Sequence, residues 1–363
     1  INVKFESVSG GTQPMIIRIA GGMAPDIFFW DTHILAPLIQ KKAVINLTPF
    51  IKKDKIDPNK FFRSAWEGVV FNKKIYGMPP YWGATAIAYN KTLFDQAGVA
   101  YPAGNWTWQD YLNMAKKLTR KKKGRIVQFG AVPPQLSTAM LSFGGAWFDR
   151  QGHFSGDTPQ VKAALSFIQD MRYKYKVSPP MSQLGTVRQS YRQEMELFMT
   201  GRLAMFTASS WTLSVLKEIK SFRWDVAPIP RKGKGKRRVE EGAAILVIST
   251  QSKHPQAAWE FVKFATYGGG TKILARGGNA VPALKEAAKE YFLPPPEHIK
   301  IFYKQLEGAV ILFSPARFTW CREWNQTILI PERDKLLLNM ETPQEMINNL
   351  KKKTESFLKG QSE

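Results

Sequence analysis

The sequence predicts an α/β fold with two lobes, on the strength of three observations. Short apolar stretches typical of buried strands alternate with segments of helical spacing along the chain. The length of 363 residues suits two cores better than one, at roughly 100–200 residues per domain. Hydrophobic residues make up 44% of the chain and aromatic residues 12%, enough for packed cores despite a net charge of +23. We expect mainly parallel sheets, with ligands beyond the carboxyl ends of the strands.

The N-terminal elements follow from hydrophobic spacing. Residues 1–5 alternate with a period of two and predict a strand, and glycines then break the pattern. Met15, Ile16 and Ile19 follow at helical spacing. The run IFFW at 27–30 is the continuous apolar stretch of a strand buried on both faces, and Trp30 and Asp31 stand at its end.

Later helices are marked by their first residues. Thr107 and Asp110 form a predicted capping box, and the apolar residues that follow lie on one helix face. Proline at the first turn marks further helix starts at Thr158-Pro159, His254-Pro255 and Thr342-Pro343, the last with Glu345. The predicted strands between these helices lie at 86–89, 203–206 and 244–248.

Motifs of several enzyme and metal-binding classes are missing. The sequence contains no GxGxxG, GxxxxGK[ST], GxSxG or HExxH, and its four histidines are far apart. The single cysteine, Cys321, excludes an intrachain disulfide and a cysteine-rich metal site. No stretch reaches the about 18 consecutive apolar residues of a membrane span. We therefore predict no catalytic residues, no metal site and no cofactor.

Paired carboxylates could act as catalytic residues, because glycosidases use two acids. Glu194 and Glu196 stand two apart on a predicted helix and so do not share a face, and Glu240 and Glu241 form the other pair. We interpret these side chains as solvated surface.

Several sequence blocks resemble a known family in order and spacing. The first block is AGGMAPDIFFWD at 20–31, and KIYGMP at 74–79 and AYNKTLFDQAGV at 88–99 follow. The later blocks are NWTWQDY at 105–111, FMTGRLAMF at 198–206 with Ser210-Trp211, WDVAPIP at 224–230, AAWEFVKF at 257–264 and NAVPA at 279–283. Together they resemble the extracellular solute-binding proteins of ABC importers, in the sugar-binding family that includes maltose-binding protein.

The resemblance implies a type II periplasmic-binding-protein fold, in which two α/β lobes close over a carbohydrate and hand it to the permease subunits of a membrane importer. It implies an N-lobe at 1–83 and 244–300, a C-lobe at 84–243 and 313–363, and a last crossing at 301–312. Family members normally begin with one more strand and helix, behind a lipoprotein or secretory signal. We therefore expect a monomeric, extracytoplasmic protein, tethered through a segment before Ile1.

Sugar recognition needs flat rings for the C–H face of the sugar and planar hydrogen-bonding groups for its hydroxyls. By resemblance, Trp30 with Asp31, Trp211 and Trp320 correspond to the ligand contacts of the family. Tyr81 and Trp82 precede the first crossing, and Trp147 follows a double glycine, so these residues are further candidates. Core packing is the alternative for each tryptophan, and we assign it to Trp66, Trp106, Trp108, Trp224 and Trp259. Arg276 and Arg317 are candidate donors to a sugar, with surface placement as their alternative.

Positive charge is concentrated in two runs. Residues 116–125 carry seven basic residues and residues 231–238 carry six, with no acidic residue in either run. Without these thirteen residues the net charge falls from +23 to +10. Neither run is interleaved with aromatic residues that stack on bases, which argues against nucleic acid. An anionic membrane or cell wall, or plain solvation, fits the runs, and the remaining +10 is compatible with an acidic sugar.

Two alternative functions stay open at this point. A polyanion-binding surface protein would use the basic runs, and its binding would weaken steeply as salt rises. A carbohydrate-active enzyme would release products from oligosaccharides, whereas a binding protein would not.

Overall fold

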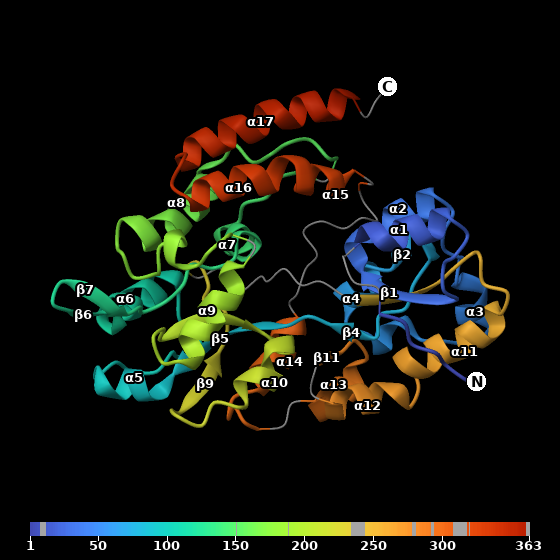
Figure 1. Cartoon of the computed structure of the whole chain (residues 1–363), viewed down its shortest axis with the longest axis horizontal. Coiled ribbons are helices and arrows are strands. Elements are labelled where there is room, and N and C mark those ends of the chain that lie inside the picture. The colour runs from blue at the N-terminus through green and yellow to red at the C-terminus, as the bar shows by residue number, and fades with distance from the viewer. Residues whose placement is uncertain are drawn as a thin grey trace. The chain divides into compact units, whose positions relative to one another are not determined.

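The computed structural model describes residues 1–7, 12–149, 151–187, 189–233, 244–277, 281–291, 294–307, 318 and 320–360 (Figure 1). Contacts divide the chain into two compact units, each built from separate segments. Unit 1 comprises Ile1–Gly83, Gly242–Tyr291 and Phe313–Arg322, and unit 2 comprises Ala84–Glu241, Phe292–Leu312 and Glu323–Glu363. The lobe boundaries given by the resemblance stay a prediction.

Unit 1 is built around two paired strands. β1 (Ile27–Asp31) runs antiparallel to β10 (Ala244–Ile248), with Trp30 opposite Ile245. α1 (Thr12–Ala20) and α2 (Leu35–Gln40) bury Met15, Leu35 and Leu38 against Phe28 and Val247, while α11 (Pro255–Thr266) packs near β10 (Figure 1). The predicted strands and helices at these positions are confirmed, but β1 is not buried on both faces as predicted, because Phe29 is 47% exposed.

Short elements complete unit 1. β2 (Val70–Phe71) pairs with β3 (Lys74–Ile75), and β4 (Tyr81–Trp82) pairs with β11 (Val281–Pro282). Its other helices are α3 (Thr48–Lys53), α4 (Arg63–Glu67), α12 (Gly270–Gly277) and α13 (Lys285–Tyr291).

The central sheet of unit 2 has the order β8-β5-β9. β5 (Thr85–Asn90), buried at all six positions, runs antiparallel to both β8 (Met205–Ser209) and β9 (Trp224–Ala227). β8 and β9 therefore run in the same direction and are connected through α10 (Leu213–Leu216).

The prediction of mainly parallel sheets is wrong, because every pairing between the named strands is antiparallel. Alternation of strands and helices does predict the shared direction of β8 and β9. It cannot show that β5, from an earlier part of the chain, lies between them in the opposite direction.

Helices surround this sheet and extend to the C-terminal region. They are α5 (Lys91–Gln96), α6 (Trp108–Leu118), α7 (Leu136–Phe143), α8 (Pro159–Tyr173), α9 (Ser190–Met199) and α14 (Lys300–Glu307). α15 (Cys321–Trp324), α16 (Ile330–Leu337) and α17 (Pro343–Gly360) follow one another near the C-terminus (Figure 1).

The predicted helix starts are confirmed. Thr107 and Asp110 form a reciprocal capping box at α6, and the Thr158 side chain accepts a hydrogen bond from the backbone of Val161 at α8. At α17, the Glu345 carboxylate accepts hydrogen bonds from the backbone and the hydroxyl of Thr342. The contacts that a backbone N–H donates satisfy groups at a helix terminus that have no partner within the helix.

Residues 1–5 do not form the predicted strand. They have no regular secondary structure, with Ile1 79% and Phe5 86% exposed, and residues 1–7 pair with no strand in the described parts of the chain. Alternation describes a strand only when a neighbouring strand takes up its backbone hydrogen bonds, and the sequence of the segment itself cannot supply that neighbour.

Glu194 is not solvated, contrary to the prediction. Its carboxylate accepts a hydrogen bond from Arg172 Nη2 at 2.8 Å, and both side chains are buried. Burial raises the pKa of Glu194, and Arg172 opposes that shift. The helical spacing does place Glu196 on the other, exposed side, where Arg192 contacts it at 3.3 Å. Spacing shows which side chains share a face, but it does not show what covers that face.

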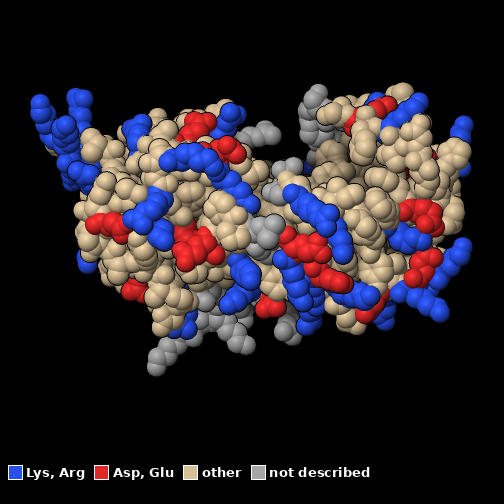
Figure 2. All heavy atoms as spheres, turned by 90° about the horizontal axis from the view of Figure 1, so that it is seen from below, with Lys and Arg blue, Asp and Glu red and all other residues tan. Residues whose placement is uncertain are grey.

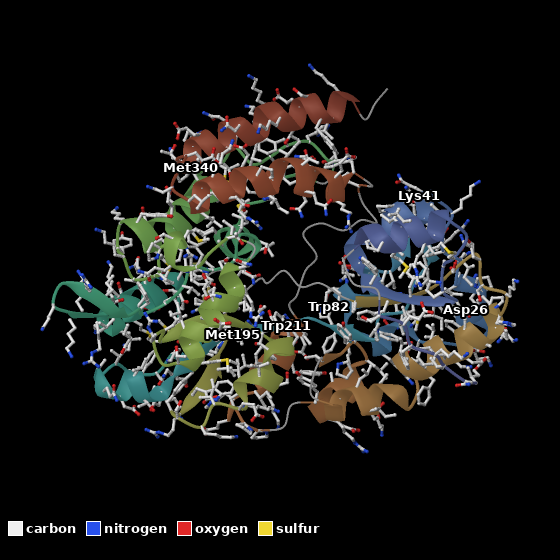
Figure 3. All side chains as sticks on the ribbon, viewed as in Figure 1. Asp26, Lys41, Trp82, Met195, Trp211 and Met340 are labelled. Atoms are coloured by element: carbon white, nitrogen blue, oxygen red, sulfur yellow. The ribbon has the colours of Figure 1, made fainter. Side chains whose placement is uncertain are left out.

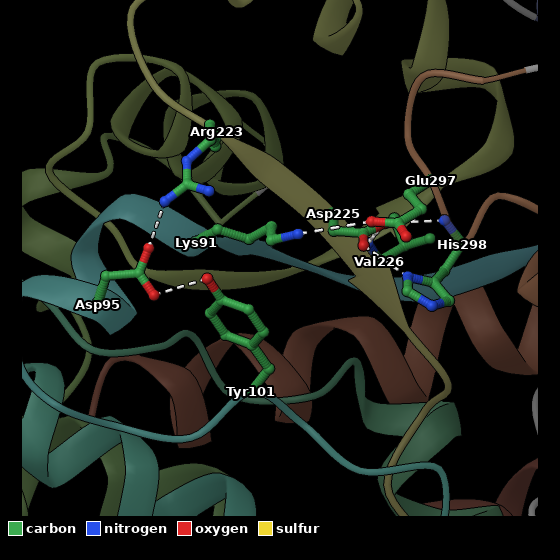
Figure 4. Close-up of polar contacts among 8 residues, drawn as sticks. All are labelled: Lys91, Asp95, Tyr101, Arg223, Asp225, Val226, Glu297 and His298. Atoms are coloured by element: carbon green, nitrogen blue, oxygen red, sulfur yellow. Dashed lines mark hydrogen bonds and ion pairs between the residues drawn. The ribbon is translucent and has the colours of Figure 1, made fainter.

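A polar network ties β9 to its surroundings in unit 2 (Figure 4). The buried Asp225 accepts hydrogen bonds from the backbone N–H groups of Val226 and His298, and its second oxygen lies 2.6 Å from His298 Nδ1. Arg223 donates to Asp95 at 2.6 Å and thereby joins the start of β9 to α5. The contacts from Val226 and His298 satisfy the Asp225 carboxylate, whose burial would otherwise be costly.

Two buried carboxyl groups meet near the C-terminus. Glu332 of α16 accepts from Lys335 at 2.8 Å and from Lys353 of α17 at 2.7 Å, and these lysines lower its pKa to about 2 against the opposing effect of burial. Burial, and then the charge of Glu332, raise the pKa of Glu341 to about 7. The ordinary pKa of a glutamate is 4.5, so between about pH 4.5 and pH 7 Glu341 is ionised in the unfolded chain and protonated in the folded protein.

Replacing Glu341 with Gln should stabilise the protein at pH 8 by about 2–3 kcal/mol and change little at pH 5. The raised pKa means that wild-type stability falls as pH rises from about 5 to about 7, whereas glutamine stays neutral and still accepts the hydrogen bond from Asn349. Glu332 stays charged throughout this window. Urea unfolding at both pH values measures the effect, with the exposed Glu355→Gln as control. Equal effects of Glu341→Gln at pH 5 and pH 8 would contradict this assignment.

Candidate ligand-binding surfaces

The end of β8 is held firmly in unit 2. The last residue pair in its register with β5 is Thr85 opposite Ser209. Just beyond it, the backbone N–H of Ser210 donates to the carbonyl of Ala84 at 2.7 Å, and the Ala84 N–H donates to the Ser210 hydroxyl at 3.3 Å. The chain therefore has a fixed position where the short helix η4 (Ser210–Thr212) begins.

Trp211 follows this clamp and is 54% exposed. Its ring centroid lies 5.5 Å from that of Tyr191 on α9, with the planes inclined at 40°. The Tyr191 hydroxyl accepts a hydrogen bond from the backbone N–H of Ser209 at 3.2 Å, and burial raises the pKa of that hydroxyl. Trp211 is thus braced on one side and open on another, as a platform for a flat apolar ligand face requires (Figure 3). We call Trp211 and Tyr191 the unit 2 platform.

Unit 1 carries a second aromatic surface. Phe29 in β1 is 47% exposed, and its ring centroid lies 5.3 Å from that of Tyr81 in β4. Tyr81 is half-buried, and burial raises its pKa to about 12. Trp30 points to the other face of β1, where it packs half-buried against the core, and Asp31 is exposed at the strand end. We call Phe29 and Tyr81 the unit 1 platform.

The other predicted tryptophans have different surroundings. Trp82 is fully buried in unit 1 (Figure 3). Trp147 is 3% exposed in unit 2, between Phe154 and Trp324, whose ring centroids are each 6.4 Å away. Trp320 is half-buried and stacks on Phe318 at 5.1 Å. All of these roles in ligand binding stay predictions.

The structure also describes most of the remaining residues named from the sequence, which are the two candidate arginines and the tryptophans assigned to packing. Arg276 is exposed in the last turn of α12, and Arg317 lies outside the described residues. Trp106, Trp108 and Trp259 are buried, and Trp66 and Trp224 are half-buried.

Sequence reasoning missed Phe29 and Tyr191. Phe29 stands beside Trp30, and alternation along β1 required one of the two to point away from the core, so this signal was present. Tyr191 lies at the start of α9, far from Trp211 in sequence, and no local pattern predicts their contact.

Among the described residues, one group of side chains has the spacing of metal ligands, namely Asp225, Glu297 and His298. The hydrogen bonds of Asp225 described above already engage both of its oxygens. Glu297 also lies 3.5 Å from Lys91 Nζ (Figure 4). The group is accounted for as a structural network.

Residues 1–266 match the sequence profile of the bacterial extracellular solute-binding proteins. The chain belongs to this family. The resemblance noted from the sequence blocks is thus confirmed, and this is a family of binding proteins rather than of enzymes. Within the described part of this solute-binding protein, no helix combines the length and apolar character needed to cross a membrane.

Relatives and solved structures agree with the family assignment. A binding protein of Brucella abortus is 24% identical over 303 residues, 81% of this chain and 71% of that protein. The arabinooligosaccharide-binding protein of Bacillus subtilis is 27% identical over 261 residues, 69% of this chain and 58% of that protein. An ABC substrate-binding protein of Listeria monocytogenes, solved in complex with cycloalternan, matches with a TM-score of 0.84 at 26% identity, over 95% of this chain and 88% of that one. The predicted periplasmic-binding-protein fold class is confirmed.

Burial predicts stability losses of very different size for two tryptophans of this solute-binding protein. Trp147→Ala should destabilise it by about 3–5 kcal/mol, because Trp147 fills a packed site in which even a Cβ on Gly156 would come within 2.7 Å of its ring. Trp211→Ala should cost no more than about 1 kcal/mol, because more than half of that side chain already faces solvent. Urea unfolding of both variants measures the free energy of unfolding, and similar losses in the two variants would contradict the exposed position of Trp211.

Proposed function

We propose that this solute-binding protein captures an oligosaccharide outside the cytoplasm and delivers it to the permease of an ABC importer, without changing the sugar chemically. The observation that carries the proposal is the exposed Trp211 packed against the ring of Tyr191, whose hydroxyl accepts a hydrogen bond from the backbone of Ser209. Relatives named for arabinooligosaccharide binding, and the related protein solved with cycloalternan, support an oligosaccharide as the ligand class.

The chemistry of the platforms suits a sugar. The C–H face of a pyranose is apolar and flat, and an aromatic ring covers it without losing hydrogen bonds. The hydroxyl rim needs polar partners, and on unit 1 the exposed Asp31 stands two residues from Phe29. Each unit offers its own aromatic surface, and we propose that both contact the ligand.

The contribution of Trp211 to the free energy of binding follows from the area of its ring that a ligand can cover. A tryptophan side chain buries about 200 Å² when fully covered, and roughly half of it is open here. Covering about 100 Å² of apolar surface contributes about 2.5 kcal/mol at about 25 cal/mol per Å². That value corresponds to roughly a 70-fold change in dissociation constant.

The ligand itself is found by a thermal-shift screen of the intact protein across neutral and acidic oligosaccharides of increasing length. A bound ligand raises the unfolding temperature by an amount that grows with its saturation. Chromatography of the recovered sugar then separates a binding protein from a carbohydrate-active enzyme, since a binding protein returns the sugar intact. Cleaved product would overturn the proposal in favour of an enzyme.

Trp211→Ala should weaken binding of that sugar by roughly 50-fold or more, because it removes the platform and leaves the clamp of β8 in place. Calorimetric titration measures the dissociation constant. Val215→Ala is the matched control, since Val215 is 40% exposed on the neighbouring α10 and is not aromatic. An unchanged affinity of the Trp211 variant would remove Trp211 from the binding site.

A further inference from the structure

The first basic run forms an exposed surface on unit 2. It begins in the last turn of α6 and continues through an antiparallel hairpin of β6 (Arg120–Lys122) and β7 (Arg125–Gln128). All seven basic side chains are exposed, and we call them the basic hairpin: Lys116, Lys117, Arg120, Lys121, Lys122, Lys123 and Arg125. Figure 2 shows a group of basic side chains projecting at the left of the view, where β6 and β7 lie in Figure 1.

Acidic side chains do not neutralise this charge within the described parts of the chain. None of the seven basic residues forms an ion pair with a described carboxylate, although Lys116 lies over the Tyr175 ring at 4.0 Å. The adjoining end of α8 adds Lys174 and Lys176, and the single contact with an acid there joins Lys174 to Asp170 at 3.7 Å. Elsewhere on the face shown in Figure 2, basic and acidic side chains are interspersed.

The charge works against the hairpin that carries it. Lys122 and Arg125 stand directly opposite each other, and like charges at such a pair are destabilising. The turn between them places Lys123 at φ +49° before Gly124 at φ +76°, and such a position favours asparagine or glycine over lysine. The hairpin would be more stable with neutral residues at these positions. Its composition therefore favours a counter-charge from beyond the described residues.

The base of the hairpin is firmly anchored. The Gln128 side chain donates to the carbonyl of Leu118 at 2.7 Å, and the Thr119 hydroxyl donates to the carbonyl of Ala115 at 2.7 Å. Gly130 passes so close to α6 that a Cβ there would lie 1.9 Å from the Ala115 carbonyl oxygen. The charges consequently project from a fixed support rather than from a loose loop.

We propose that the basic hairpin docks on the phosphate headgroups of an anionic bilayer. Charge complementarity argues for phosphate, and each Lys or Arg near such a surface adds to binding. The hairpin itself contains no aromatic ring on which a base could stack, which disfavours nucleic acid. Its exposed apolar side chain is Val127, 44% exposed, which suits the headgroup boundary. This docking is independent of the sugar and positions the protein beside a membrane.

The test is co-sedimentation of the intact chain with vesicles of three parts phosphatidylcholine to one part phosphatidylglycerol, at low and high salt. The variant combines Lys121→Gln, Lys122→Gln, Lys123→Asn and Arg125→Gln. It removes the like-charge pair and the strained lysine, so it should keep the unfolding temperature of the wild type. We expect it to lose on the order of 100-fold in vesicle affinity, and wild-type binding to fall steeply with salt.

A matched control removes the same charge elsewhere. Lys41, Lys42, Lys52 and Lys53 are exposed on unit 1, and their combined replacement with Gln should leave most of the vesicle binding. Equal losses in both variants, or equal binding to pure phosphatidylcholine, would overturn the proposal. Tighter binding of duplex DNA or of a soluble polyphosphate than of the vesicles would overturn the lipid assignment in favour of a polymer. Calorimetric titration of the hairpin variant with the sugar should give the affinity of the wild type. Failure of the membrane proposal can therefore be distinguished from failure of the sugar proposal.

Discussion

The antiparallel pairing of β5 with β8 fixes where Trp211 can lie, and the candidate chemistry of unit 2 depends on it. The pairing ends with Thr85 opposite Ser209, and Ser210 is then bound to Ala84 by two hydrogen bonds. Tyr191 supports the same corner through the backbone of Ser209. A ring that is fixed before the ligand arrives loses little conformational freedom on binding, which leaves more of the stacking energy for affinity.

Two kinds of surface are carried by different elements of unit 2. The aromatic platform lies at the end of β8 and on α9, whereas the positive charge that has no acidic partner among the described residues lies on β6, β7 and the end of α6. Stacking on an aromatic ring is insensitive to salt, whereas attraction to phosphate is screened within about 10 Å at 0.1 M salt. The separation allows a neutral ligand to be bound by a protein whose net charge is +23.

Local sequence signals predicted many of the helices and strands, but they did not predict which side chains are buried. The reciprocal bonds of Thr107 and Asp110, and the proline after Thr158, mark helix starts because capping involves residues close in sequence. Contacts between distant residues leave no such mark: nothing near Glu194 shows that Arg172 will cover it, and nothing near residues 1–5 supplies a partner strand. The same limit applies to the tryptophans, since the sequence around Trp147 and Trp211 does not show that one is buried and the other exposed. The family blocks could identify the relatives, but the exposure of each ring depends on the packing of this chain.

The salt dependence of sugar affinity distinguishes binding by the aromatic platforms from binding by the positive charge. The dissociation constant of a neutral oligosaccharide should be measured by calorimetry at 50 mM and at about 500 mM sodium chloride, a range over which phosphate-dominated binding falls by orders of magnitude. If the aromatic platforms hold the ligand, the dissociation constant should change by less than about twofold. A steep loss of affinity with salt, or the absence of saturable binding at low salt, would contradict it.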